Sequence, residues 1–368
     1  MNKPDYNNSI TNLSNSILKH FNANPFHNTI KEIDDFLVNK NKVIVFLFDG
    51  MGKALIEKHL DKNSFLRKHI IKDITSTFPP TTVAATSSML SAKYPIETGW
   101  LSWTQYFKEV QTNVKMFANK DEITGEKIKG VHLGNTYCHY ENIIDIINRV
   151  NKKEIAKLTQ GTNVDTTHFW NRHLKAFIRH NFKLIKSIDN DKSFVYAYWT
   201  NPDHDIHEFG VNHKKVHKVI NKINKYMEHF CNKNKDVTTI VIADHGLIDV
   251  KYLPYYQDKE IQECLIRPFS FEKRSANFFV KPEMKKQFVE IFNNHYGEHY
   301  ELFTKEQIMD MKIYGDNLPS EYINQFFGDY IAIAKDEYMF ELEDDFKFKA
   351  HHAGGTLDEL LISVIGIN

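Results

Sequence analysis

Residues 43–50 read VIVFLFDG, a continuous apolar run that ends in an aspartate and a glycine. Such a run, rich in β-branched and aromatic residues, is typical of a strand buried on both faces of a parallel sheet. Residues 193–199 and 237–243 are two further runs of this kind, whereas residues 53–60 and 212–233 read as helices. Strands that alternate with helices predict an α/β fold with a doubly wound, mostly parallel sheet.

The chain has 368 residues, which allows one large α/β core with an insertion. Residues 1–250 are expected to form this core, with a polar helical arm before the first strand. Residues 104–185 within it are irregular and rich in aromatic and charged residues, and they are expected to carry lid elements. Residues 251–345 are dominated by aromatic and acidic residues and are predicted to form an inserted α+β cap. Residues 346–368 then return to the core with a last apolar strand.

The composition excludes several classes of function. Lysine plus arginine and aspartate plus glutamate both number 47, so the net charge of zero gives no reason to expect a nucleic acid duplex or an anionic membrane as partner. Cys138, Cys231 and Cys264 have no paired spacing and predict neither a disulfide framework nor a cysteine zinc site. The N-terminus lacks the apolar run of a signal peptide, and no segment is long enough to span a membrane. A cytoplasmic protein is expected, and the sequence does not indicate its oligomeric state.

Acidic and histidine side chains follow the predicted strands. Asp49 ends the first run, Asp203 follows the second, and Asp244 and His245 follow the third. Ligands in an open α/β sheet gather beyond the C-terminal ends of the strands, so these side chains can converge. His207 lies four residues after Asp203, which places both on one side of a helix. Each residue alone has an ordinary reading as a cap, turn or surface residue, but together the carboxylates and imidazoles predict a zinc or manganese centre.

These segments resemble the motifs of the alkaline phosphatase superfamily, above all those of its type I phosphodiesterase/nucleotide pyrophosphatase branch. The resemblance rests on four stretches: FDG at residues 48–50, PDHDIHEFG at residues 202–210, DHGL at residues 244–247 and HAGGTLDELL at residues 352–361. It covers the core segments and leaves the lid and the cap unmatched.

The resemblance implies two divalent metal ions per chain, zinc in the first place and manganese as the alternative. The implied ligands are Asp203, His207 and His352 for one ion, and Asp49, Thr82, Asp244 and His245 for the other.

The nucleophile of this family is a threonine. Spacing back from Tyr94, which with the following proline resembles the family's Tyr-Pro, selects Thr82. Thr77, in a Thr-Phe-Pro that resembles the nucleophile motif of nucleotide pyrophosphatases, lies too far from Tyr94. Prolines at residues 79–80 and a capping Thr81 would place Thr82 at a helix N-terminus, where backbone N–H groups favour a phosphate. A threonine hydroxyl ionises poorly at neutral pH and therefore needs the metal as its activator.

Candidate substrate contacts are fewer and less specific. Trp103 stands where nucleotide pyrophosphatases have an asparagine that holds a phosphate oxygen, which is a departure from the family pattern. Tyr198 falls where the branch has an aromatic residue against a nucleobase, and it reads equally well as a core strand residue. Arg267, Lys273 and Arg274 in the cap lie near many aromatic residues, which suits an anionic, partly flat substrate. The alternative is that these charges are solvated surface groups.

The function implied by the resemblance is metal-dependent hydrolysis of phosphate diesters or phosphoanhydrides. Thr82 would attack phosphorus, and water would then cleave the phospho-threonine intermediate. The expected partner is a small phosphorylated substrate, with a nucleotide as a candidate. A phosphomonoesterase and a phosphomutase remain open on the same metal centre, and a catalytically dead binding protein is the alternative from another class. The complete ligand set argues against that last alternative.

Overall fold

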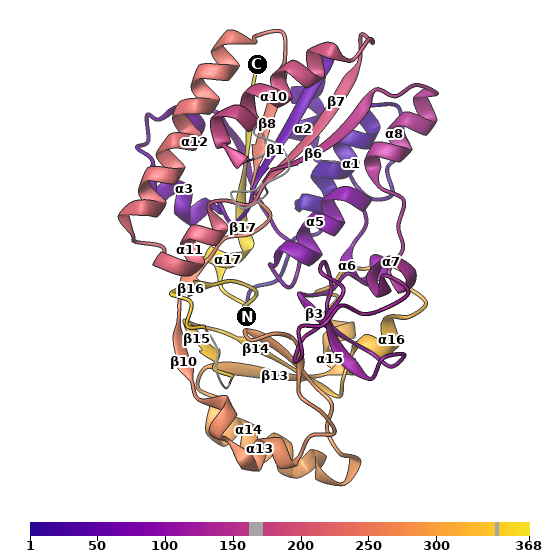
Figure 1. Ribbon diagram of the computed structural model, residues 1–368, viewed down its shortest axis with the longest axis vertical. Coiled ribbons are helices and arrows are strands. Elements are labelled where there is room, and N and C mark those ends of the chain that lie inside the picture. The colour runs from indigo at the N-terminus through magenta and orange to yellow at the C-terminus, as the bar shows by residue number, and fades with distance from the viewer. Residues whose placement is uncertain (162–171, 343–345) are drawn as a thin grey trace.

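The protein consists of a large α/β core and a smaller cap that lies against one end of it (Figure 1). The computed structural model describes residues 1–161, 172–342 and 346–368. Parts of the predicted lid and cap, residues 162–171 and 343–345, lie outside these ranges. The C-terminal ends of the parallel core strands point toward the cap, so any site that they form faces the junction of the two parts.

The core is built on a sheet of six strands in which β1 (Lys42–Phe48) is central. The strand order is β2 (Ile70–Thr75), β17 (Leu361–Ile367), β8 (Thr238–Ile242), β1, β7 (Ser193–Trp199) and β6 (Ala156–Gly161). β1 pairs in parallel with β7 and β8, whereas β17 runs antiparallel to both of its neighbours. The predicted α/β class with a mostly parallel sheet is therefore confirmed.

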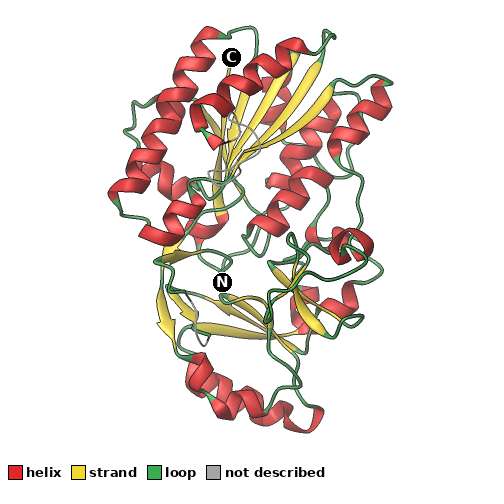
Figure 2. Ribbon diagram, in the orientation of Figure 1, coloured by secondary structure: helices red, strands yellow, loops and turns green. Residues whose placement is uncertain are grey.

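Helices cover both faces of this sheet, which explains why β1 is apolar at almost every position (Figures 1 and 2). Val43 to Phe48 are all buried, so a strand of this composition is stable only between two helical layers. One layer contains α3 (Lys53–His59), α4 (Phe65–Lys68), α10 (Leu174–Ser187), α11 (Asp203–Phe209) and α12 (Lys214–Lys233). The other contains α1 (Ile10–His20), α2 (Lys31–Leu37), α5 (Thr82–Ser91) and α8 (Ile143–Asn151).

The cap is built on a second sheet, of seven strands, that draws on two distant parts of the chain. Its order is β13 (Tyr300–Thr304), β14 (Tyr330–Ala334), β12 (Ser275–Phe278), β11 (Ser270–Glu272), β3 (Thr104–Phe107), β4 (Thr112–Lys115) and β5 (Lys120–Asp121). The junction is the antiparallel pair of Phe271 in β11 with Thr104 in β3. The cap is therefore continuous with a segment that precedes most of the core.

This sheet shows regular structure within residues 104–185, the segment that the sequence predicts to be irregular and to carry lid elements. Residues 104–121 form a meander of three strands on the cap sheet, whereas β6 and α10 belong to the core. The strands of the meander are only two to four residues long, so they show no alternation of apolar and polar residues to mark them in the sequence. Pairing with β11, more than 160 residues away, is what completes them.

The remaining elements are short and connect or flank the two sheets. Two small pairings are β10 (Lys251–Leu253) with β15 (Tyr338–Phe340), and β9 (Ile248–Asp249) with β16 (Ala350–His351). The other helices are α6 (Pro95–Thr98), α7 (Leu133–Tyr137), α13 (Lys259–Glu263), α14 (Lys285–Tyr296), α15 (Lys305–Asp310), α16 (Ile323–Phe326), α17 (Leu357–Leu360), and the turns η1 (Tyr255–Gln257) and η2 (Pro282–Met284). None of the helices in the described ranges combines the length and apolar character of a membrane span.

Candidate metal centre and active site

Three neighbouring core strands deliver acidic residues to one place. Asp49 follows β1, Asp244 follows β8, and Asp203 opens α11 shortly after β7. Because β7 and β8 flank β1 in parallel register, these three positions meet at the same edge of the sheet. The backbone joins two of them directly, since the N–H of Asp203 donates a hydrogen bond of 2.9 Å to the carbonyl of Asp49.

Glycines allow these loops to approach so closely. Gly50 has a φ of +71°, and a Cβ added there would lie 2.9 Å from the Cβ of Asp203. A Cβ on Gly246 would lie 2.0 Å from the carbonyl oxygen of Asp358, which no packing adjustment relieves. The glycine of the FDG stretch is therefore required where the loops of Asp49 and Asp203 meet, and that of the DHGL stretch where the loop of Asp244 packs on α17.

Four candidate ligand atoms surround one point next to His245. Its Nε2 lies 3.1 Å from Thr82 Oγ1, 3.5 Å from Asp49 Oδ1 and 3.5 Å from Asp244 Oδ2. Four ligands about 2.0 Å from a tetrahedral zinc ion lie about 3.3 Å from one another. His245 Nδ1 lies 3.1 Å from the carbonyl oxygen of Gly246, which leaves Nε2 for the ligand role. The spacing of this group fits a metal ion.

Asp244 provides the strongest support for a metal-binding role of this group. Its Oδ1 accepts hydrogen bonds of 3.0 Å from the N–H groups of Gly50 and His245. Its Oδ2 is buried and has no hydrogen-bond partner within the described residues. A buried carboxylate oxygen is expensive to leave without a counter-charge, so its position beside His245 Nε2 favours a metal ion there.

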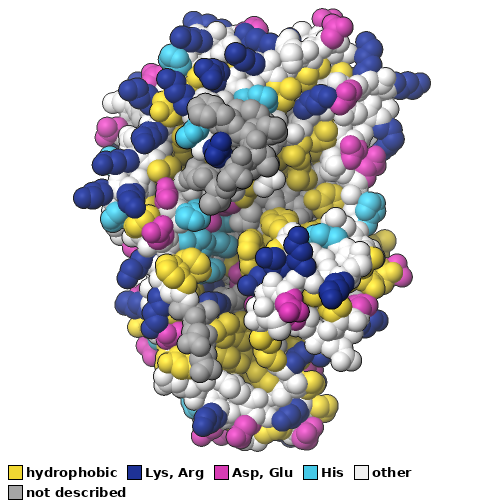
Figure 3. All heavy atoms as spheres, viewed as in Figure 1, with side chains coloured by type: hydrophobic (Ala, Val, Ile, Leu, Met, Phe, Trp, Pro, Cys, Tyr) yellow, Lys and Arg dark blue, Asp and Glu magenta, His cyan; other side chains and the backbone are white. Residues whose placement is uncertain are grey.

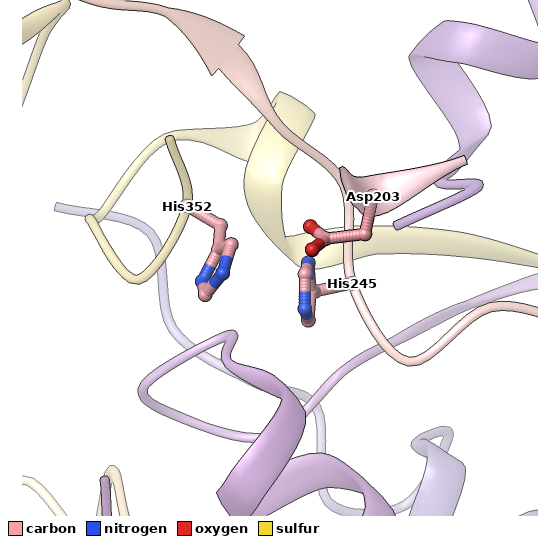
Figure 4. A group of neighbouring side chains, drawn as sticks. All are labelled: Asp203, His245 and His352. Atoms are coloured by element: carbon pink, nitrogen blue, oxygen red, sulfur yellow. The ribbon is translucent and has the colours of Figure 1, made fainter. Parts of the chain in front are cut away.

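A second group lies beside the first, around Asp203. Its Oδ1 is 3.3 Å from His207 Nε2, and His207 Nδ1 is held 2.8 Å from the carbonyl oxygen of Ala350. The ring of His352 lies 5.1 Å from that of His207 and 4.0 Å from that of His245, between centroids. Atoms of Asp203, His245 and His352 fall within 4.8 Å of one another, and Figure 4 shows these side chains around a common space.

Electrostatics in this site favour a bound cation. Burial, followed by the charges of Asp244 and Asp203, raises the pKa of Asp49 well above its ordinary value. Burial also opposes ionisation of Asp203, but the adjacent His207 outweighs it and lowers the pKa of that carboxyl. Burial and then His245 lower the pKa of His352 well below its usual range, so its imidazole is neutral and free to act as a ligand. Divalent ions would relieve the crowding of these carboxylates.

Thr82 is the candidate nucleophile that faces this group. It is the first residue of α5, and its hydroxyl donates a hydrogen bond of 3.4 Å to Asp49 Oδ1. Thr81 precedes the helix and points elsewhere, toward Glu272 in the cap. The Thr77 hydroxyl donates to the carbonyl of Pro79 at 3.4 Å. Of these three threonines, only Thr82 lines the cavity described next.

A cavity of about 1330 Å³ lies between the core and the cap, with the candidate ligands Asp49, Thr82, Asp203, His207 and His352 on its floor. Its mouth is a hollow with histidines along one side and hydrophobic and basic side chains along the other (Figure 3). Aromatic and apolar residues form much of the wall: Leu90, Trp103, Phe117, Ile123, Tyr140, Leu158, Tyr196, Tyr198, Tyr255, Phe269, Phe271, Leu342, Phe346 and Phe348. A flat or apolar substrate portion fits such a wall.

The predicted substrate contacts divide into two groups. Tyr198 and Trp103 line the cavity, and the Tyr198 hydroxyl donates a hydrogen bond to Asp49 Oδ2. Arg267 and Arg274 are not among the described residues that line it. The guanidinium of Arg267 lies between the rings of Tyr106 and Phe279, 3.6 and 3.8 Å from their centroids.

Arg274 has a structural position. It is fully buried, and its Nε and Nη2 each donate to Glu359 at 2.8 Å. Its Nη1 and Nη2 also donate to the carbonyl oxygens of Tyr338 and Asp336. This placement leaves Arg274 no surface with which to contact a substrate, which corrects the expectation drawn from its charge. Lys273, its neighbour, does line the cavity.

Glu272 is a cavity residue that the sequence did not reveal. It ends β11, is only 6% exposed, and accepts hydrogen bonds from the Thr81 hydroxyl and the Trp103 N–H. Burial raises its pKa to about 7. No motif or spacing marks this glutamate, because its partners are brought to it only by the pairing of β11 with β3.

The fold and the site together define an α/β protein of the alkaline phosphatase-like class. Residues 43–356 match the profile of the family described as type I phosphodiesterase/nucleotide pyrophosphatase. The chain therefore belongs to that family, which supports a phosphodiesterase or pyrophosphatase type of hydrolase and the use of metal ions. The resemblance seen in the sequence is confirmed. No match was found among curated proteins.

Solved structures show the same fold at low sequence identity. Murine ectonucleotide pyrophosphatase/phosphodiesterase 5 matches with a TM-score of 0.63 and 15% identity, over 89% of this chain and 88% of that one. An inactive variant of the murine protein in complex with AMP gives 0.62 and 14%, again over 89% and 88%. The human protein gives 0.63 and 14% over the same shares. These likenesses cover most of the chain and support the assignment of the fold.

Proposed function

We propose that this protein is a two-metal hydrolase of phosphate diesters or phosphoanhydrides and that Thr82 is its nucleophile. The observation that carries the proposal is the position of the Thr82 hydroxyl. It lies at the N-terminus of α5, within 3.1 Å of His245 Nε2 and 3.4 Å of Asp49 Oδ1. A phosphate at that helix end would be held by backbone N–H groups directly beside the hydroxyl.

The proposed reaction has two displacements at phosphorus, and different residues take part in each. In the first, Thr82 Oγ1 attacks phosphorus opposite the leaving oxygen, and the Asp49 carboxylate, 3.4 Å away, is the proposed acceptor for the hydrogen of the hydroxyl. In the second, water cleaves the phospho-threonine from the side of Asp203 and His207. Bound divalent ions would supply the positive charge that activates the hydroxyl and the water and that offsets the charge developing on phosphorus. Tyr198 holds the second oxygen of Asp49 and so orients that carboxylate.

The donor atoms favour zinc. One proposed ligand set is Asp49, Thr82, Asp244 and His245, and the other is Asp203, His207 and His352. Imidazole nitrogens mixed with a few carboxylate oxygens suit zinc, whereas magnesium and calcium prefer oxygen alone. Manganese is the alternative metal for such a set.

Purified protein is expected to contain about two divalent ions per chain, by elemental analysis. The double substitution Asp244→Asn, His245→Ala removes two ligands of one set and should lower the content by about one ion. His217→Ala, an exposed histidine of α12, is the control and should leave the content unchanged. A double variant that retained the full complement would exclude this ligand assignment.

The cavity favours a substrate larger than a simple phosphate ester. Its lining combines many aromatic residues, two lysines (Lys115 and Lys273) and several of the candidate metal ligands. Such a wall suits the base and sugar of a nucleotide or another flat alcohol portion, and the lysines suit an additional anionic group. We infer a nucleotide-like diester or anhydride, in keeping with the AMP bound to the murine neighbour.

Hydrolysis of paired nitrophenyl esters tests this function. Metal-replete protein is expected to release nitrophenol from bis(p-nitrophenyl) phosphate faster than from p-nitrophenyl phosphate, and chelation should abolish both activities. A preference for the monoester would assign a phosphomonoesterase instead. Transfer of the phosphoryl group to an added alcohol would assign a mutase. Absence of both metal and turnover would assign a binding protein.

A further inference from the structure

The cap is hydrogen-bonded to the residue before the proposed nucleophile through the side chain of Glu272. This residue ends β11, the strand that joins the inserted part of the cap sheet to β3. Its Oε1 accepts a hydrogen bond of 2.8 Å from Thr81 Oγ1 and another of 3.1 Å from the backbone N–H of Trp103. One carboxyl oxygen therefore ties the start of α5 to the cavity wall.

Thr81 donates its hydroxyl to Glu272 and does not cap the first turn of α5 with its side chain. Thr81 is the N-cap residue of α5, a position from which a threonine hydroxyl usually accepts a hydrogen bond from an N–H in the first turn. No such side-chain cap is present here. The first N–H groups of a helix have no partner within the helix, so those at the start of α5 remain open toward a phosphate beside Thr82.

We propose that Glu272 is a positioning residue for Thr82. Its carboxyl holds the Thr81 hydroxyl away from the helix axis, fixes the first turn of α5, and so sets the direction of the Thr82 hydroxyl. The inserted cap thereby takes part in aligning the nucleophile as well as in forming the cavity. The proposal rests on Thr82 being the nucleophile, as proposed above.

Two substitutions of Glu272 distinguish the effect of its hydrogen bonds from the effect of its charge. Glu272→Gln keeps an acceptor oxygen for both donors, and its kcat on the nitrophenyl diester should stay within about threefold of the parent. Glu272→Ala removes the acceptor, and its kcat should fall about tenfold to a hundredfold, the loss typical of small misplacements. Metal content should change little in either variant, because no proposed ligand is removed. KM should change less than kcat, because Glu272 lines the cavity but its hydrogen bonds go to Thr81 and Trp103.

Asp258→Ala is the control for general loosening of the cap. Asp258 is a cap carboxylate that accepts hydrogen bonds from the Ile261 N–H, His295 and Tyr296, with no contact to α5. The kcat of the Asp258→Ala variant should match that of the parent. An equal fall in Asp258→Ala and Glu272→Ala would overturn the proposal, as would a parental kcat in Glu272→Ala or an equal loss in Glu272→Gln and Glu272→Ala.

Thr81→Val tests the same contact from its other side and does not disturb the cap. It should lower kcat in the same direction as Glu272→Ala, and adding it to Glu272→Ala should lower kcat little further, since both remove one bond. Fully additive losses would show that the two residues act independently and would contradict the proposal. If Thr82→Ala were active, the proposed nucleophile would fail; if it were inactive while Glu272→Ala behaved as the parent, only this inference would fail.

Discussion

Replacing Thr82 with alanine is expected to lower kcat on a phosphate diester at least about a thousandfold, the scale of loss when a nucleophile is removed. The reason is that the Thr82 hydroxyl is the group at the start of α5 that faces Asp49 and His245. The substitution removes only a small part of a buried side chain, so the fold should persist. Steady-state kinetics, with circular dichroism to check the fold, would measure the effect.

Three related variants serve as controls for this result. Thr82→Ser keeps the hydroxyl and should retain part of the activity. Thr77→Ala and Thr81→Ala should lose far less than Thr82→Ala, because neither hydroxyl lines the cavity. An active Thr82→Ala beside an inactive Thr81→Ala would show that the spacing back from Tyr94 misplaces the nucleophile by one residue.

Arg274→Ala is expected to lower the free energy of unfolding by about 3–5 kcal/mol, because it breaks a fully buried ion pair and leaves the other charge without a partner. Both Arg274 and Glu359 are 0% exposed. Glu359 also accepts hydrogen bonds of 2.7 Å from the Gly354 N–H and the Thr356 hydroxyl. The ion pair thus joins the cap to the loop that follows His352.

Urea denaturation of metal-stripped protein measures this effect without the contribution of metal binding. Arg149→Ala is the matched control, since Arg149 and Glu141 form an ion pair with side chains 62% and 44% exposed. Exposed pairs contribute about 0–1 kcal/mol, so this control should stay close to the parent. Equal and small shifts in the two variants would show that the Arg274 pair does not hold the cap and the His352 loop together.

The core could be predicted because its signals are local. The apolar runs at residues 43–48, 193–199 and 237–243 are buried at almost every position, and the side chains after them meet because parallel strands end at one edge. Asp49, Asp203 and the Asp244–His245 pair needed only this rule to be placed near one another. Their family resemblance and the α/β class are confirmed by the profile match and the structural neighbours.

The cap could not be predicted to the same depth because its structure depends on distant partners. Its sheet joins residues 104–121 to residues 270–334, and short strands carry little pattern of their own. Arg274 and Glu272, two residues apart, illustrate the consequence. The sequence drew attention to the positive charge of Arg274, which forms an internal ion pair with Glu359. It gave no sign that the Glu272 carboxyl accepts a hydrogen bond from Thr81.

The stereochemical course at phosphorus tests the proposed mechanism most directly. A phosphorothioate diester of one configuration would be hydrolysed in water enriched in a heavy oxygen isotope, and the configuration of the product would be determined. Each in-line displacement inverts phosphorus, so attack by Thr82 followed by attack by water predicts overall retention. Inversion would show a single displacement by water and would contradict the role of Thr82 as nucleophile, whatever its effect on the rate.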